Sequence, residues 1–199
     1  MIQEPTLEEI LANSHDSFSV SLKKLVHDLL VNLREMPDTD GTIIILGYKD
    51  EYNQHVGLGM NRDLFEEDPI SIYNPTALER IYETTIGQQD DGAILVDPWG
   101  IITNSGVYLE PRLKHLLEEL GMLNDRDYSQ KYGFAEHVGT RHLNSIASSY
   151  RMPDATIFTL SASSGRIRIY EQGKIIYSPI PEEIVLPKKQ KLQEELVAA

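Results

Sequence analysis

The chain of 199 residues contains no cysteine, which excludes a disulfide framework, a thiolate metal site and a cysteine nucleophile. It also has no stretch near the ~20 apolar residues that a membrane-spanning helix needs. Its start, Met1 to Pro5, lacks the basic and apolar segments of a signal peptide. These absences lead us to expect a soluble, cytoplasmic protein with no membrane partner.

Positive charge is scarce. The chain has 18 Lys and Arg against 31 Asp and Glu, a formal net charge of -13. Such a surface repels the phosphates of DNA and RNA, so we expect no nucleic-acid partner. A nucleotide site would need a local basic pocket, helped by backbone N–H groups or a divalent cation.

Several common site motifs are missing as well. Gly57-Leu58-Gly59 lacks the remaining glycine spacing of a dinucleotide-binding loop, and no Walker sequence occurs. The six His are scattered, with no pair at i, i+4 spacing beside a carboxylate, which argues against a zinc hydrolase.

The patterns that are present predict an α/β fold with a mixed central sheet flanked by helices. Thr6 to Glu9 has the form of a capping box at a helix start, and Pro37 to Gly41 forms a turn cluster. We therefore divide the chain into an N-terminal helical element (1–40), a main domain (41–180) and a charged tail (181–199). Helices are expected at about 6–13, 19–35, from 74, 111–120 and 140–150, and strands at 42–47, 93–96, 101–103, 156–160, 166–170 and 174–177.

Asp91-Gly92-Ala93 directly precedes an apolar strand. A carboxylate at a strand edge followed by Gly can face a ligand at close range, and it suits Mg²⁺ or Mn²⁺. Asp-Gly is also a common turn dipeptide, so a purely structural role remains an alternative.

Gly139-Thr140-Arg141-His142 stands at an expected helix start. Free N–H groups there favour a phosphate, and Arg141 and His142 add side-chain donors. The alternative is a Thr N-cap followed by two solvated residues. Ser161 opens a polar turn that could either line a nucleotide pocket or merely close a hairpin.

The order of these motifs resembles the diadenylate cyclase (DAC) domain family, over roughly residues 41–177. The resemblance implies a DAC-like fold and an enzyme that condenses two ATP into cyclic di-AMP and two pyrophosphates. It also implies a homodimer or higher homo-oligomer with facing active sites, and Mg²⁺ or Mn²⁺ as cofactor. The residues it implies are Asp91 for the metal and catalysis, Arg141 and His142 for catalysis and nucleotide binding, and further nucleotide contacts by Gly92, Ala93, Tyr108, Thr140 and Ser161.

Two departures from the family pattern keep other functions open. Leu143 stands where the family has a second Arg, and Ser161 is followed by Ala162 rather than a charged residue. Arg166 or Arg168 could compensate. The rival hypothesis is a non-catalytic DAC-like module that binds ATP or cyclic di-AMP, and a third is a structural or assembly protein.

Overall fold

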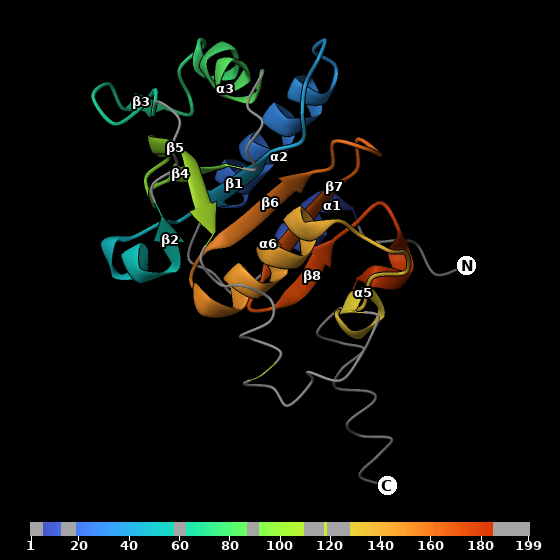
Figure 1. The fold of residues 1–199 in the computed structure, drawn as a ribbon. Coiled ribbons are helices and arrows are strands. Elements are labelled where there is room, and N and C mark those ends of the chain that lie inside the picture. The colour runs from blue at the N-terminus through green and yellow to red at the C-terminus, as the bar shows by residue number, and fades with distance from the viewer. Residues whose placement is uncertain are drawn as a thin grey trace, which may run out of the picture.

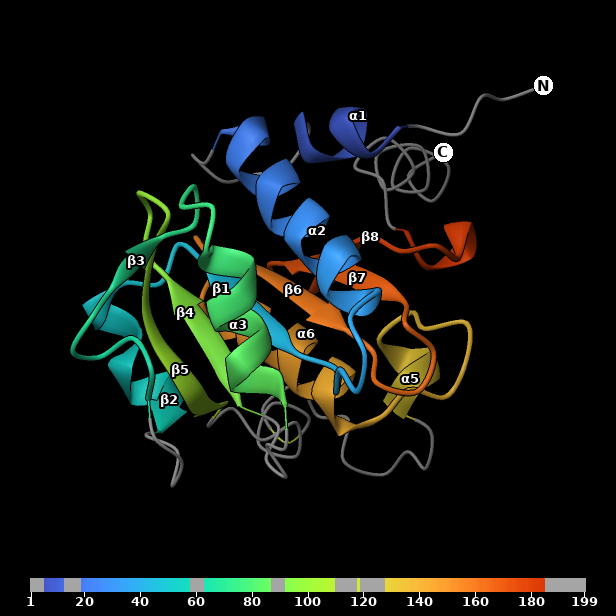
Figure 2. The ribbon, with the colours of Figure 1, turned by 90° about the horizontal axis from the view of Figure 1, so that it is seen from above.

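The computed structural model describes residues 6–12, 19–57, 63–86, 92–109, 118 and 128–184. Their strands form one 8-stranded sheet with helices on both faces (Figures 1 and 2), which confirms the predicted mixed α/β class. The strands are β1 (Ile43–Leu46), β2 (Val56–Gly57), β3 (Ile70–Ser71), β4 (Ala93–Val96), β5 (Ile101–Leu109), β6 (Thr156–Leu160), β7 (Ile167–Glu171) and β8 (Lys174–Tyr177). The helices are α1 (Leu7–Ala12), α2 (Val20–Arg34), α3 (Ala77–Thr85), α5 (Tyr128–Lys131) and α6 (Thr140–Arg151), with 3-10 turns η1 (Asp50–His55) and η2 (Pro181–Glu183).

The sheet has the strand order β2-β5-β4-β1-β6-β7-β8, and β3 pairs with β5 outside this path. Strand β1 lies in the middle. It is parallel to β4, with Ile43 opposite Ala93, and antiparallel to β6, with Ile43 opposite Thr159. Every other pairing is an antiparallel one between the described strands. The start of β1 is therefore flanked by the start of β4 and the end of β6.

The two N-terminal helices begin with side-chain caps. The Thr6 N–H donates to Glu9 Oε2 at 2.8 Å, and the Glu9 N–H donates to Thr6 Oγ1 at 3.3 Å, which confirms the predicted capping box. The Leu22 N–H at the start of α2 donates to Ser19 Oγ at 3.2 Å. Both helix starts are thus specified by local sequence.

Two apolar clusters lie on the two faces of the sheet. Helices α2 and α3 cover one face, and α6 covers the other (Figure 2). The alternation of a strand sends neighbouring side chains to opposite faces, so Ile44 and Ile94 belong to the first cluster, and Ile43 and Leu95 to the second. This explains why β1 and β4 are apolar at every position, and why β6, which also contains Thr156 and Thr159, is buried along its whole length.

The first cluster crosses the predicted boundary at residue 40. Val26, Leu30 and Leu33 of α2 are fully buried in it, beside Ile44 of β1. The division of the chain into 1–40 and 41–180 remains a prediction, but the apolar core is continuous across it.

The later part of the chain also follows the predicted pattern where it is described. Asp97 to Ile101 closes a hairpin between β4 and β5, with the Asp97 N–H donating to the Ile101 carbonyl at 2.8 Å. Apart from residue 118, the helix expected at 111–120 lies outside the described residues, and so does the tail from 188. Within the segment assigned to the charged tail, Glu183 of η2 is buried.

Candidate functional site

The residues singled out by sequence meet at one end of the sheet, around the start of β1. Gly92 precedes β4, and Ser161 follows β6. Because β4 and β6 are the two neighbours of β1, both residues lie beside Thr42, which exchanges backbone hydrogen bonds with Leu160 at 2.8 and 3.1 Å. Residues almost 70 positions apart in sequence are thereby brought together.

Arg141 reaches this end from the first turn of α6. A Cβ atom built on Gly41 would lie 2.4 Å from Arg141 Nη1, 2.3 Å from the Leu160 carbonyl oxygen and 2.4 Å from the Ala162 nitrogen. The guanidinium group therefore packs directly over Gly41 and beside the turn that begins at Ser161. Only a residue without a side chain allows this approach.

Thr140 lies at the exposed start of α6, and the N-cap residue is Gly139, whose φ and ψ are -73 and 172°. No side chain caps this helix start within the described part of the chain. The predicted Thr N-cap is thus wrong, because Thr140 is the first helical residue. The N-terminus of α6 presents backbone donors and the positive end of the helix dipole at this edge of the sheet.

His142 points into the core rather than toward solvent. It is 4% exposed, and its Nδ1 lies 2.7 Å from the Tyr170 hydroxyl. Burial, followed by the nearby charges of Arg168 and Arg141, lowers the pKa of His142 to about 4. The alternative of a solvated first-turn residue is wrong for His142. It is a neutral imidazole at pH 7.

The hydroxyl of Tyr170 lies within hydrogen-bonding distance of that imidazole. Burial raises the pKa of Tyr170 well above its usual value, so the hydroxyl keeps its proton and can donate it to Nδ1. In the tautomer that accepts this proton at Nδ1, the ring proton lies on Nε2. That nitrogen is buried and has no hydrogen-bond partner among the described residues.

Ser161 stabilises its own turn. Its Oγ accepts a hydrogen bond from the Ser164 N–H and lies near Ser163 Oγ, each at 3.3 Å. Its N–H donates to the Arg166 carbonyl at 3.0 Å. The hairpin interpretation of this turn is confirmed, and the turn places Ser161 next to Arg141.

Ala93 and Tyr108 occupy neighbouring strands at the same end. Ala93 pairs with Val107, and a Cβ atom on Gly92 would lie 2.5 Å from the Gly106 Cα atom, so these two strands touch closely there. Val107 and Leu109 pack in the cluster beneath α6. Strand alternation therefore turns the half-buried Tyr108 toward the opposite face.

Asp91, the predicted metal ligand, lies outside the described residues. Across the described ranges, no three His, Asp or Glu side chains gather as a metal site.

A cleft of about 940 Å³ runs along β4 and β5 next to η1. Asp97, Pro98 and Trp99 line its far end, while Val107, the register partner of Ala93, lies at the near end. Trp99 is 78% exposed there. The cleft provides space of nucleotide size, but Gly92, Arg141 and Ser161 are not among the residues that line it.

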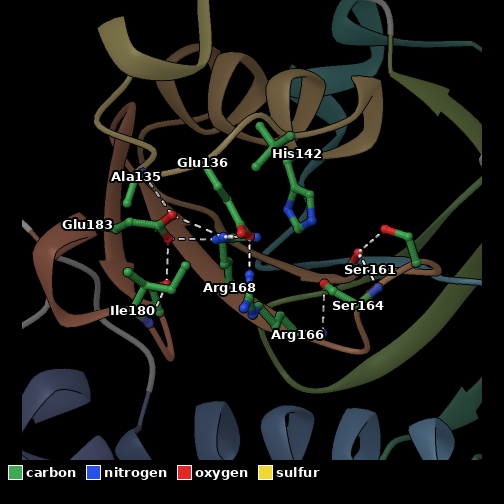
Figure 3. A network of polar contacts seen from close by, with 12 residues as sticks. Ala135, Glu136, His142, Ser161, Ser164, Arg166, Arg168, Ile180 and Glu183 are labelled. Carbon is green, nitrogen blue, oxygen red and sulfur yellow. Dashed lines mark hydrogen bonds and ion pairs between the residues drawn. The ribbon is translucent and has the colours of Figure 1, made fainter.

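A network of two arginines and two glutamates lies beside His142 (Figure 3), and the sequence analysis did not find it as a unit. Arg168 Nε and Nη2 donate to the two carboxylate oxygens of Glu183 at 2.7 and 3.0 Å. Arg168 Nη2 also donates to Glu136 Oε1 at 3.0 Å, and Arg166 Nη1 donates to that same oxygen. Glu136 and Glu183 stand in segments without a motif, so only the alternating Arg166 and Arg168 gave a signal.

Within the described ranges, no helix has the length and apolar character needed to cross a bilayer.

No family model and no curated protein matches the sequence. Among solved structures, the chain is similar to a hypothetical membrane-spanning protein from Bacillus cereus, at 18% identity and a TM-score of 0.50, over 82% of this chain and 63% of that one. It is also similar to a double-cysteine variant of DacA from Staphylococcus aureus, at 19% identity and a TM-score of 0.47, over 90% of this chain and 97% of that one. The first likeness shows a shared fold, in which the chain spans 63% of the other protein's length.

Proposed function

We propose that this protein is a cytoplasmic diadenylate cyclase, which condenses two ATP into cyclic di-AMP at a site between two facing subunits. The observation that carries the proposal is the meeting of both motifs at one end of the sheet. Arg141 packs over Gly41 beside the Ser161 turn, and Gly92 directly precedes β4, the strand next to β1. The DAC resemblance in the sequence predicts this convergence, because its motif residues must contact one nucleotide.

In the proposed reaction, the 3′-hydroxyl of one ATP attacks the α-phosphorus of the other. A phosphorus–oxygen bond forms, pyrophosphate leaves, and the hydroxyl proton passes to a base or to water. The same step at the second pair of groups closes the ring. Each subunit supplies one ATP, so the reaction requires at least a two-fold dimer.

The residues of this chain have separate roles in that reaction. Asp91 binds the divalent cation and orients the attacking hydroxyl. Mg²⁺ or Mn²⁺, when bound, stabilises negative charge on the phosphate oxygens and on the leaving pyrophosphate. Arg141 and the start of α6 bind the polyphosphate, with Thr140 and Ser161 as further contacts. Gly92 and Ala93 allow close approach of the nucleotide, and Tyr108 contributes to the adenine contact.

His142 acts as a neutral hydrogen-bond donor in this scheme. Its Nδ1 is engaged by Tyr170, and the buried Nε2 has no partner among the described residues. A neutral imidazole with its proton on Nε2 can donate to a phosphate or ribose oxygen without adding charge to the core.

The test is to incubate the purified protein with ATP and either Mg²⁺ or Mn²⁺, and to detect cyclic di-AMP by mass spectrometry. Asp91→Asn should abolish product formation, while Asp154→Asn, which removes an exposed carboxylate paired with Lys49, should not. Absence of product from the wild-type protein with both metals would refute the cyclase proposal.

The rival function, a module that binds ATP or cyclic di-AMP without turnover, is favoured by Leu143. Its side chain packs against the apolar cluster beneath α6, where the family pattern has a cation. Tight nucleotide binding by calorimetry, without product under any metal condition, would select this function.

A further inference from the structure

The Arg168 guanidinium is held in a buried ion pair that stabilises the fold. Its side chain is 1% exposed, and Glu183, whose side chain is 0% exposed, binds it through both carboxylate oxygens. Its plane also lies over the Phe134 ring, at 5.5 Å from the centroid. Moving Arg168 toward a ligand would leave a buried carboxylate unpaired, which is strongly unfavourable.

Arg166 is placed differently, although it is only two positions away. Its side chain is 38% exposed, and Glu136, its partner, is 40% exposed. Glu136 shares one oxygen, Oε1, between Arg166 and Arg168. Because Arg168 is already matched by Glu183, the carboxylate of Glu136 serves mainly to hold Arg166. An ion pair this exposed is weak.

Arg166 lies at the same end of the sheet as the motif residues Arg141 and Ser161. Its carbonyl accepts the Ser161 N–H, and its N–H donates to Ser164 Oγ at 3.4 Å, so it belongs to the turn beside Arg141. Figure 3 shows Arg166, Glu136 and Arg168 gathered below the His142 ring, with Ser161 alongside. Three guanidinium groups, those of Arg141, Arg166 and Arg168, here accompany two carboxylates in an otherwise acidic chain.

We infer that Arg166 is a second guanidinium of the phosphate site, held by Glu136 until a polyphosphate replaces that carboxylate. The inference rests on the proposed nucleotide site and extends it to a residue outside the motifs. A polyphosphate carries more negative charge than one carboxylate and binds a guanidinium fork through two oxygens. The exchange keeps Arg166 paired, and Arg168 stays with Glu183. Arg166 thereby supplies a cation from the β6–β7 turn, whereas α6 carries Leu143.

The test compares binding of ATP and of adenosine, in the presence of Mg²⁺, by titration calorimetry on the full chain. Arg166→Gln should weaken ATP binding about tenfold or more, as expected for a lost charge-assisted hydrogen bond, and should leave adenosine binding unchanged. Glu136→Gln should instead tighten ATP binding severalfold, because the carboxylate that competes with phosphate is gone. If the Arg166–Glu136 ion pair were merely structural, the two variants would not change ATP affinity in opposite directions.

Lys24 and Glu8 provide the matched control, since Lys24 is 45% exposed, its Nζ lies 3.6 Å from an exposed carboxylate, and neither residue lines the cleft. Lys24→Gln and Glu8→Gln should leave both affinities unchanged. If the wild type binds ATP but Arg166→Gln binds it equally well, or Glu136→Gln weakens it, the role of Arg166 is refuted and the nucleotide site stands. A wild type that binds no ATP refutes both.

Discussion

His142 is the residue where burial and chemistry are most closely coupled. Its ring is packed near Phe134 and Tyr170, with ring centroids 6.2 and 6.4 Å away. The unpaired Nε2 is the kind of buried polar atom that folded proteins rarely keep without a ligand or water to satisfy it. The same burial makes the residue a source of pH-dependent stability.

We expect the free energy of unfolding to fall as the pH is lowered from 6.5 toward 4. The pKa of His142 is about 4 in the folded protein and near 6.5 in the unfolded chain, so the unfolded chain binds the proton first. Stability from this residue is complete above pH 6.5, and about 2 kcal/mol of it should be lost by pH 5. Urea unfolding at pH 7 and pH 5 measures this loss.

The matched comparison is His142→Gln, which should lose about 2 kcal/mol less than the wild type between these pH values. His27, whose pKa is also lowered by burial, is present in both proteins, so its contribution cancels. The pKa values of Glu183 and Glu136 are lowered by their arginine partners. These two carboxylates therefore change the free energy of unfolding only below their usual pKa of 4.5. Equal pH dependence in both proteins would contradict the burial of a neutral His142.

Gly41→Ala should destabilise the fold by about 1–3 kcal/mol, the usual effect of an added methyl in a packed site. The new Cβ atom would meet the Leu160 oxygen, the Ala162 nitrogen and Arg141 Nη1, all within 2.4 Å. Gly139→Ser is the control, because a Cβ atom there meets nothing within 4 Å and Ser is a good N-cap residue. Thermal unfolding that ranks the two variants equally would argue against the close approach of Arg141 to Gly41.

At the scale of elements, α2 is joined to the sheet by a buried ion pair. Lys23 Nζ lies 3.0 Å from Glu171 Oε1 of β7, with side-chain exposures of 0 and 5%. The Thr156 hydroxyl of β6 donates to the same carboxylate oxygen at 2.8 Å. One helix and two strands therefore meet at a single charged contact within the apolar layer.

Lys23→Met should cost about 3–5 kcal/mol, because it leaves the Glu171 charge buried without its ammonium partner. Lys24→Met, one position along, removes an exposed Lys that lies 3.6 Å from Glu8, and should change stability by less than about 1 kcal/mol. Chemical denaturation of both variants checks the difference. Adding Glu171→Gln to Lys23→Met should recover part of the loss, and a failure of Lys23→Met to exceed Lys24→Met would contradict the buried pair.

Most elements could be predicted from the sequence because their signals are local. The Thr6–Glu9 capping box, the apolar strands and the turn at Asp97 each depend on residues near in the chain. The order of the strands could not be read in this way, since it depends on packing between distant segments. The 3-10 turn at Asp50 to His55 was missed for a related reason: it has no apolar periodicity.

The candidate site was predictable only where a motif carries it. Arg141 and Ser161 stood out by their motifs, and the structure brings them together. Gly41 gave no signal beyond its place before a strand, because its role depends on a guanidinium 100 residues later in the chain. Glu136 and Glu183 gave no sequence signal, since their ion pairs with Arg168 depend on tertiary packing.

For the whole molecule, the continuous core makes a prediction about the segment 1–40. Removing it should abolish cooperative unfolding of the remainder, because Val26, Leu30 and Leu33 fill one face of the sheet and would leave Ile44 exposed to water. Near-UV circular dichroism and size-exclusion chromatography of residues 41–199 would show lost tertiary packing or aggregation. A truncated chain that unfolds cooperatively at the wild-type temperature would instead support an independent domain at 41–180.

The central position of β1 has a consequence for the way a ligand acts on the fold. Strands β1 to β5 come from residues 43–109 and β6 to β8 from residues 156–177, and the two groups of strands meet at the β1–β6 ladder. A nucleotide bound by Gly92 and by Arg141 and Ser161 would contact residues beside both groups of strands and would hold the two groups together. Amide hydrogen exchange of β1 and β6 should then slow on binding, in proportion to the occupancy of the site.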